Sequence, residues 1–333
     1  MKPESKLILF CIICFGAFLR LYHLDFQCLW AEELYTQAMV QLSVVDIIIK
    51  SITSDFTPPL YYLAAHFLAP RVVSVICGVL TIMVMYFVGA GYKDDITGLY
   101  CAGATAFLFP LVYYSQFGRS YSMSILFFAI TLLFYNKEKL GYPFVIFASL
   151  TIWTHLFNVI PIAFMLIYSE HTNKKLMLGI PILTFPLIIP LYNAVVNRTS
   201  AIANFGMTLS EILYITPIEL FGSLYVPATI IILYSCLNKI YTQLVLVAIS
   251  TISIGVLSSF YIPFFPRYFI VVDMMSILII GSVLSDFTRK QYRGLQYLIV
   301  IFILILVASF QNQDFVVHYF TQRYSCNSEI SLL

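Results

Sequence analysis

Between residues 58 and 71 the chain reads Pro58-Pro59-Leu60-Tyr61-Tyr62-Leu63-Ala64-Ala65-His66-Phe67-Leu68-Ala69-Pro70-Arg71, a short apolar segment with proline at both ends. Proline suits the first turn of a helix and stops a helix that precedes it, so we expect a helix over 58–69. A helix of this length rises about 18 Å, whereas the hydrocarbon core of a bilayer is about 30 Å thick. We therefore predict that the segment lies on a membrane surface and does not cross the membrane.

The membrane interpretation itself rests on composition. The chain has 333 residues, of which 61% are hydrophobic and 10% charged, whereas soluble domains contain about 25% charged residues. Apolar runs throughout such a length favour one polytopic membrane domain, residues 1–333. The first run ends in Arg20-Leu21-Tyr22-His23 without a small-residue cleavage site, which favours a retained helix. A net charge of +2 gives no indication of a nucleic-acid partner.

Because about 20 apolar residues cross a bilayer, the sequence predicts eleven spans, at 7–22, 72–92, 97–115, 121–135, 141–154, 155–169, 176–195, 213–236, 240–262, 267–286 and 294–310. With 58–69 on the surface, every lysine except Lys50 falls on one side, at the N-terminus or in the gaps 93–96, 136–140, 170–175, 237–239 and 287–293. Lysine-rich gaps are typical of the cytoplasmic side. The first loop (23–70), with interfacial helices at about 30–50 and 58–69, the loop 196–212 and the tail 311–333 are then expected outside.

The predicted outer ends of the spans, opposite the lysine-rich gaps, carry arginines and acids. They are the six arginines at positions 20, 71, 119, 198, 267 and 323 and the acids Glu32, Glu33 and Asp55. Apart from Asp273, no acid or base lies in the middle of a span, which argues against an ion pathway. Arginine near a membrane interface is costly to desolvate, and an anionic ligand offsets that cost. The pattern indicates chemistry at one interface on an anionic, lipid-linked substrate.

Simpler explanations exist for each residue taken alone. Glu32 and Glu33 suit the first turn of any helix, and Asp55 suits a helix N-cap. Gly118 explains a tight turn without a ligand, and Arg267 could extend its charge to the membrane interface.

The cysteines show no metal-binding pattern. Cys11 and Cys14 have CxxC spacing but lie in an apolar helix, where small buried side chains are the better interpretation. Cys28 and Cys326 both fall outside the predicted spans, so a disulfide between them stays open.

The order of the motifs resembles that of the C-type glycosyltransferases, most closely the protein O-mannosyltransferase and aminoarabinose-transferase-like branch (glycosyltransferase family 39-like). The resemblance covers about residues 7–170 and 260–285. It is carried by Arg20, Trp30-Ala31-Glu32-Glu33, Asp55-Phe56-Thr57-Pro58-Pro59-Leu60-Tyr61-Tyr62, Arg71-Val72-Val73-Ser74, Ser115-Gln116-Phe117-Gly118-Arg119-Ser120-Tyr121, His155 and Pro266-Arg267-Tyr268.

The resemblance implies an all-α membrane protein of the GT-C fold that transfers a sugar from a polyprenyl-phosphate donor, at the outer face, to a lipid, glycan or protein acceptor. It implies Glu32 as the catalytic base, with Glu33 and Asp55 orienting the acceptor or the helix. The donor phosphate would be bound by Arg119, Arg267 and Arg71, and the substrates contacted by Tyr61, Gln116, Tyr121, His155 and Tyr268. Beyond the donor lipid no cofactor is expected, and a divalent metal has no support in the sequence.

The sequence departs from the family pattern at Glu32, where the family has Asp, and at Thr57, where it has His. Two alternatives stay open: a catalytically inactive homologue that acts as an assembly partner, and a transporter or flippase for a lipid-linked glycan. For Arg20 an alternative role is an ion pair with Glu33, in which case its substitution mainly harms folding.

Overall fold

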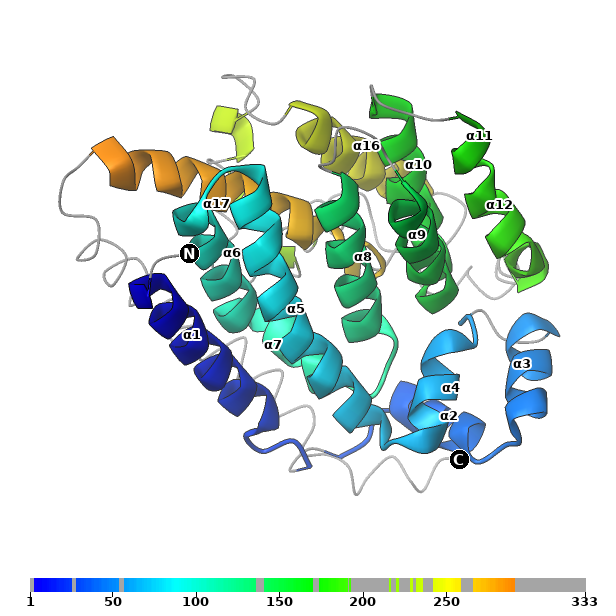
Figure 1. Ribbon diagram of the computed structural model, residues 1–333. Helices are drawn as coiled ribbons and strands as arrows, with labels where there is room; N and C mark the ends of the chain where they lie inside the picture. Colours follow the sequence, from blue (N-terminus) through cyan, green and yellow to red (C-terminus); the bar gives the residue numbers. More distant parts are fainter. Residues whose placement is uncertain are drawn as a thin grey trace.

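The computed structural model describes residues 3–25, 28–53, 57–135, 141–169, 174–190, 192, 216, 220–221, 228–229, 232–235, 242–258 and 266–290. Within these ranges the regular structure is helical throughout, with no strands (Figure 1). The α-helices are α1 (Pro3–Leu21), α2 (Ala31–Val40), α3 (Val44–Thr53), α4 (Leu60–Phe67), α5 (Pro70–Tyr92), α6 (Asp95–Phe107), α7 (Phe109–Ser115), α8 (Tyr121–Tyr135), α9 (Tyr142–Thr154), α10 (Val159–Tyr168), α11 (Lys174–Met177), α12 (Gly179–Thr184), α16 (Thr242–Ser258) and α17 (Val272–Lys290). Short 3₁₀ helices are η1 (Leu156–Asn158), η2 (Phe185–Leu187) and η5 (Pro266–Phe269).

The central helix is α5, which packs against α1, α6 and α8. In the described part of the chain it is the helix that is long and apolar enough to cross a bilayer unaided, and α6 with α7 meets the same criterion as a pair bent by 60°. One side of α5 is buried, while Val72, Ile76, Leu80, Met83 and Phe87 are exposed at helical spacing. An apolar stripe of this extent suits contact with lipid.

The segment 23–70, predicted as the first outer loop, contains three helices where the sequence predicted two. The helix expected at about 30–50 is divided into α2 and α3. The break follows from Ser43, whose hydroxyl accepts a hydrogen bond from the Asp46 backbone N–H at 3.2 Å and so begins a new helix. The helix expected over 58–69 is α4, which has eight residues, and it lies with α2 at one end of the bundle (Figure 1).

The segment expected as one span at 97–115 is bent at Leu108, between α6 and α7. Pro110 causes the bend, because it has no N–H to donate to the carbonyl of Ala106, four residues earlier. Arg20 supplies the missing donors: its Nη1 donates to Ala106 O at 3.0 Å and its Nη2 to Thr105 O at 2.8 Å. The end of α1 is thereby fixed to the bend.

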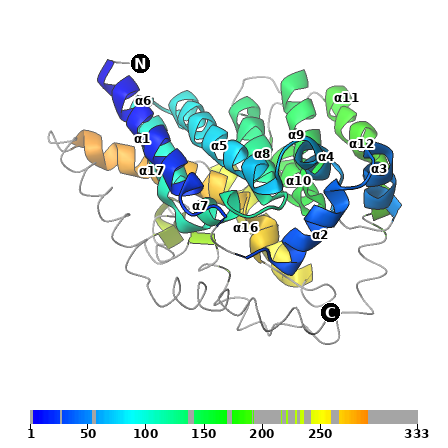
Figure 2. The ribbon, with the colours of Figure 1, turned by 90° about the horizontal axis from the view of Figure 1, so that it is seen from below.

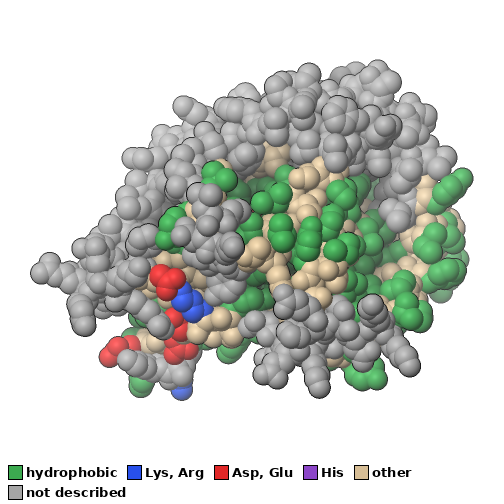
Figure 3. Space-filling model, turned by 90° about the horizontal axis from the view of Figure 1, so that it is seen from above, with side chains coloured by type: hydrophobic (Ala, Val, Ile, Leu, Met, Phe, Trp, Pro, Cys, Tyr) green, Lys and Arg blue, Asp and Glu red, His purple; other side chains and the backbone are tan. Residues whose placement is uncertain are grey.

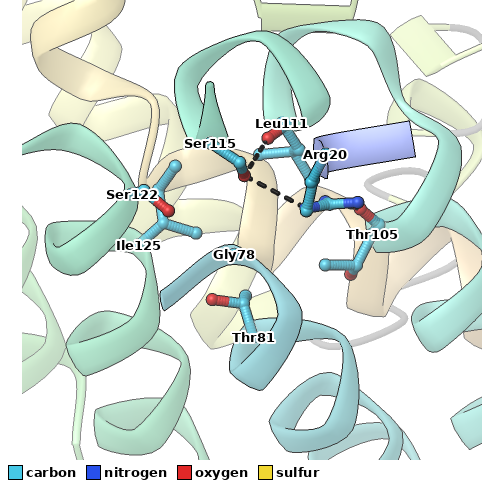
Figure 4. Close-up of a pocket in the computed structure, with 8 residues that line it drawn as sticks. All are labelled: Arg20, Gly78, Thr81, Thr105, Leu111, Ser115, Ser122 and Ile125. Atoms are coloured by element: carbon cyan, nitrogen blue, oxygen red, sulfur yellow. Dashed lines mark hydrogen bonds between the residues drawn. The ribbon is translucent and has the colours of Figure 1, made fainter. Parts of the chain in front are cut away.

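Arg20 is 1% exposed, and its Nε also donates to Ser115 Oγ at 3.1 Å. Gly78 leaves space for this contact, because a Cβ at that position would lie 2.8 Å from Arg20 Nε. The expected alternative of an Arg20–Glu33 ion pair is wrong, since Glu33 pairs with Arg71. The group lines a cavity of about 10 Å³ between α1, α5, α6, α7 and α8 (Figure 4).

Several predictions fall wholly or largely outside the described residues: Asp55, the loop 196–212, the span 294–310 and the tail 311–333. Cys28 is disulfide-bonded, whereas the other described cysteines, Cys11, Cys14, Cys77 and Cys101, are free. Cys326 lies outside the described residues, so its pairing with Cys28 stays a prediction.

Candidate functional site

The candidate site lies at the end of the bundle where α2 crosses beneath the other helices, as Figure 2 shows from below. Glu32 and Glu33 stand in the first turn of α2. Because successive helix positions point about 100° apart, the two carboxylates face different neighbours.

Glu33 faces inward and is 1% exposed. Its Oε1 accepts from Arg71 Nε at 2.8 Å and from the Gly118 N–H at 2.8 Å. Its Oε2 accepts from Arg71 Nη2 at 2.9 Å and from the Trp30 N–H at 3.2 Å. Four hydrogen bonds, two of them in a bidentate pair, satisfy this buried charge. Glu33 therefore fixes α2 to α5 and to the turn at Gly118.

Glu32 points to a different side of α2 and is partly exposed. Its Oε1 forms an ion pair with Arg267 Nη2 at 2.8 Å, with the two side chains 35% and 29% exposed. Its Oε2 is shielded from solvent and accepts no hydrogen bond from the described residues. A carboxylate oxygen that is shielded from solvent and accepts no hydrogen bond costs free energy, unless a bound ligand donates to it. The geometry suits an oxygen that receives a proton from a bound group.

Arg119 reaches the same region from the turn between α7 and α8. Its Nη1 donates to Thr36 Oγ1 at 3.2 Å and to the Tyr62 hydroxyl at 3.0 Å, and its Nη2 donates to Thr57 Oγ1 at 3.2 Å. These partners come from α2, α4 and the residues before α4. Thr36 lies one turn of α2 from Glu32, and Glu32 pairs with Arg267, so Arg119 and Arg267 both contact the same stretch of α2.

Aromatic side chains form one wall beside the ion pair. The ring centroids of Tyr121 and His155 lie 5.9 Å apart, those of His155 and Tyr268 5.1 Å apart, and those of Tyr268 and Phe157 5.1 Å apart. Tyr121 is buried, whereas His155, Phe157 and Tyr268 are partly exposed. The wall can contact an apolar or sugar-containing ligand next to Glu32.

Three residues expected to contact substrates instead use their polar groups inside the protein. Arg71 donates to Glu33 and to the carbonyls of Leu24 and Cys28. The Gln116 amide donates to the carbonyls of Leu19, Arg20 and Tyr22, which caps the end of α1. Tyr61 is 0% exposed, and its hydroxyl bonds Pro70 O and Ser74 Oγ; burial raises its pKa. In the described structure these contacts hold helices together, and the substrate roles expected for the three residues stay predictions.

The structure adds Thr36, Tyr62 and Phe157 to the site. The sequence analysis gave none of them a role, although Tyr62 belongs to the motif that begins at Asp55. Thr36 follows Glu32 by four residues, so it lies on the same face of α2. The four-residue spacing from Glu32 is the sequence signal that could have identified Thr36. Thr57 had been noted only as a departure from the family motif, and its contact with Arg119 gives it a place in the site.

The opposite face of the molecule has different chemistry. In Figure 3 this face is hollowed, with hydrophobic side chains along the hollow and charged side chains at one edge. At this end of the bundle, Lys93 Nζ contacts Asp286 at 2.6 Å, and Ser285 Oγ donates to Asp94 Oδ1 at 3.2 Å. These contacts connect the α5–α6 turn to α17. Among the described residues, no group of three or more His, Cys, Asp and Glu side chains could hold a metal ion.

No family model matches this chain, and no curated protein matches it. Among solved structures, the crystal structure of ArnT from Cupriavidus metallidurans bound to undecaprenyl phosphate is similar, with a TM-score of 0.55 and 13% sequence identity. The similarity covers 86% of this chain. This chain has the GT-C fold. It is an all-α polytopic membrane protein, as the sequence predicted. The match spans 61% of the ArnT chain, so the GT-C fold is shared over part of ArnT.

Proposed function

We propose that this GT-C protein is a membrane glycosyltransferase of the protein O-mannosyltransferase and aminoarabinose-transferase-like type. It transfers a sugar from a polyprenyl phosphate to a hydroxyl of a lipid, glycan or protein acceptor. The observation that carries the proposal is Glu32, which pairs with Arg267 through one oxygen and keeps a second, shielded oxygen without a hydrogen-bond donor among the described residues. The fold shared with ArnT, whose structure contains undecaprenyl phosphate, supports the donor class.

In the proposed reaction, Glu32 Oε2 takes the proton of the acceptor hydroxyl. The acceptor oxygen attacks the anomeric carbon of the donor sugar and forms the new glycosidic bond. The bond between that carbon and the phosphate oxygen breaks, and polyprenyl phosphate leaves with the electron pair. One displacement of this kind inverts the anomeric configuration.

Phosphate is already a good leaving group, so the reaction needs stabilisation of the growing negative charge more than a general acid. Arg119 and Arg267 both supply positive charge beside α2, through the contact of Arg119 with Thr36 and that of Arg267 with Glu32. A guanidinium binds phosphate oxygens through two parallel N–H groups. We assign the phosphate to these two arginines and leave Arg71 as the residue that positions Glu33 and α2.

The aromatic wall of Tyr121, His155, Phe157 and Tyr268 would contact the sugar or the first isoprene units of the donor. The site is assigned to the non-cytoplasmic side because the lysine-rich gaps lie at the other ends of the predicted spans. The donor lipid would lie with its prenyl chain in the membrane and its phosphate at the interface.

A transfer assay tests the proposal. Purified protein is incubated in vesicles with polyprenyl-phosphate sugars extracted from membranes, and release of polyprenyl phosphate is followed by mass spectrometry. The proposal expects release that depends on added acceptor and is abolished in Glu32→Gln. Absence of release from the wild type with every extracted donor would favour the inactive-homologue alternative.

A further inference from the structure

The hydroxyl of Thr36 connects the proposed base to the proposed phosphate-binding arginine. Its oxygen lies 3.1 Å from the backbone oxygen of Glu32 and 3.2 Å from Arg119 Nη1. Thr36 is 0% exposed. One buried hydroxyl therefore contacts both halves of the site.

The direction of these two bonds is fixed by chemistry. Arginine carries donors only, so the Thr36 oxygen must accept from Arg119. A hydroxyl has a single proton, and the carbonyl of Glu32 can only accept, so that proton points to Glu32. The bond to the carbonyl four residues earlier is one that helical threonine commonly makes. It aims the lone pairs of the hydroxyl at Arg119.

The other contacts of Arg119 complete its orientation. Tyr62, which is 0% exposed, accepts from the same Nη1, and Thr57 accepts from Nη2. Of these three hydroxyls, that of Thr36 is the one on α2 itself, one turn from Glu32. A displacement of Arg119 relative to α2 would therefore stretch the Thr36 contact first.

Resting on the proposed function, we propose that Thr36 is a positioning residue that sets the distance between the base Glu32 and the phosphate-binding Arg119. It touches neither reacting atom. It holds the guanidinium in register with the first turn of α2, so that the donor phosphate and the acceptor hydroxyl are presented together. Misplacement of reacting groups by about 1 Å can cost about 10²-fold in rate.

Thr36→Val tests this role, because valine keeps the shape of threonine and removes the hydroxyl. The matched control is Thr251→Val in α16, where a threonine that is also 0% exposed donates to Val247 O, four residues earlier, at 2.7 Å. Thr36→Ser restores the hydroxyl. For each variant we would measure kcat and donor KM for transfer, the Kd for undecaprenyl phosphate, and the melting temperature.

We expect similar small losses in melting temperature for Thr36→Val and Thr251→Val, since both lose one back-bond within a helix. Only Thr36→Val should lose about tenfold or more in kcat/KM, with Thr36→Ser within about threefold of the wild type. Wild-type kcat/KM in Thr36→Val, or an equal loss in Thr251→Val, would overturn the proposal.

Failure of the proposed function gives a different pattern. If the wild type binds undecaprenyl phosphate but transfers nothing, the proposed reaction falls, while a weaker Kd in Thr36→Val alone still supports the positioning of Arg119. In this non-transferring case, the role of Thr36 is refuted as well if Thr36→Val binds undecaprenyl phosphate as tightly as the wild type does. It is also refuted if the wild type does not bind undecaprenyl phosphate.

Discussion

Replacing Glu32 by glutamine separates its two proposed tasks, taking a proton and pairing with Arg267. Glutamine has nearly the same shape but does not accept a proton at neutral pH. A positioned general base contributes about 10²- to 10⁴-fold to rate, so kcat should fall by about that factor.

The same substitution should strengthen the binding of the donor lipid, although it slows transfer. The Glu32–Arg267 pair is partly solvated, with side chains 35% and 29% exposed, and such pairs contribute about 0.2–1 kcal/mol. In the resting protein Arg267 is shared with Glu32, and the donor phosphate must compete for it. Loss of the pair should therefore tighten the Kd for undecaprenyl phosphate by about 1.4- to 5-fold, taking RT as about 0.59 kcal/mol.

The assay combines transfer kinetics with binding of undecaprenyl phosphate to the same purified samples. The matched control is Asp286→Asn, which removes the partly exposed Lys93–Asp286 pair at the other end of the bundle and should change neither quantity. Transfer by Glu32→Gln at the wild-type rate would refute the assignment of the base. A Kd weakened by tenfold or more would refute the competition between Glu32 and phosphate for Arg267.

Three further predictions concern the arginines, the buried pair and the topology. Arg119→Lys and Arg267→Lys should each weaken binding of undecaprenyl phosphate and slow transfer, because lysine cannot donate two parallel bonds to phosphate; an unchanged Kd in both would remove them from the phosphate site. Glu33→Gln should lower the free energy of unfolding by about 3–5 kcal/mol, since it leaves the buried charge of Arg71 without its carboxylate partner. In thermal unfolding, Glu33→Gln should lose more stability than Glu32→Gln does, and equal losses would contradict the structural role of Glu33. A cysteine introduced at position 138 should resist a membrane-impermeant thiol reagent added outside, and one at position 202 should react; the reverse pattern would invert the proposed topology.

The helices that form the bundle were predictable from composition and spacing. The apolar runs beginning at 72, 121 and 141 correspond to α5, α8 and α9. The short helix α4 followed from Pro58-Pro59 and Pro70, whose effects are local. The division between α2 and α3 at Ser43 was missed because a single serine was not recognised as the start of a new helix within the segment 30–50. The bend before Pro110 was also missed, although a proline within an apolar run is a known signal for one.

The site was predictable only as a set of residue types at one end of the spans. Which acid pairs with which arginine depends on packing between segments 38 residues apart for Glu33 and Arg71 and 235 residues apart for Glu32 and Arg267. Sequence spacing shows that Glu32 and Glu33 diverge, but it does not show which one faces inward. The hydroxyls of Thr36 and Tyr62 carry no charge pattern, so their contacts with Arg119 emerge only from the fold.

The most direct measurement is a cryo-electron microscopy map of the Glu32→Gln protein with undecaprenyl phosphate. The account predicts phosphate density within about 3 Å of guanidinium nitrogens of both Arg119 and Arg267, the distance of a charged hydrogen bond. Residue 32 should lie beside that density, with Arg71 still bound to Glu33. Phosphate density elsewhere in the protein, or contact with neither arginine, would contradict the proposed donor site.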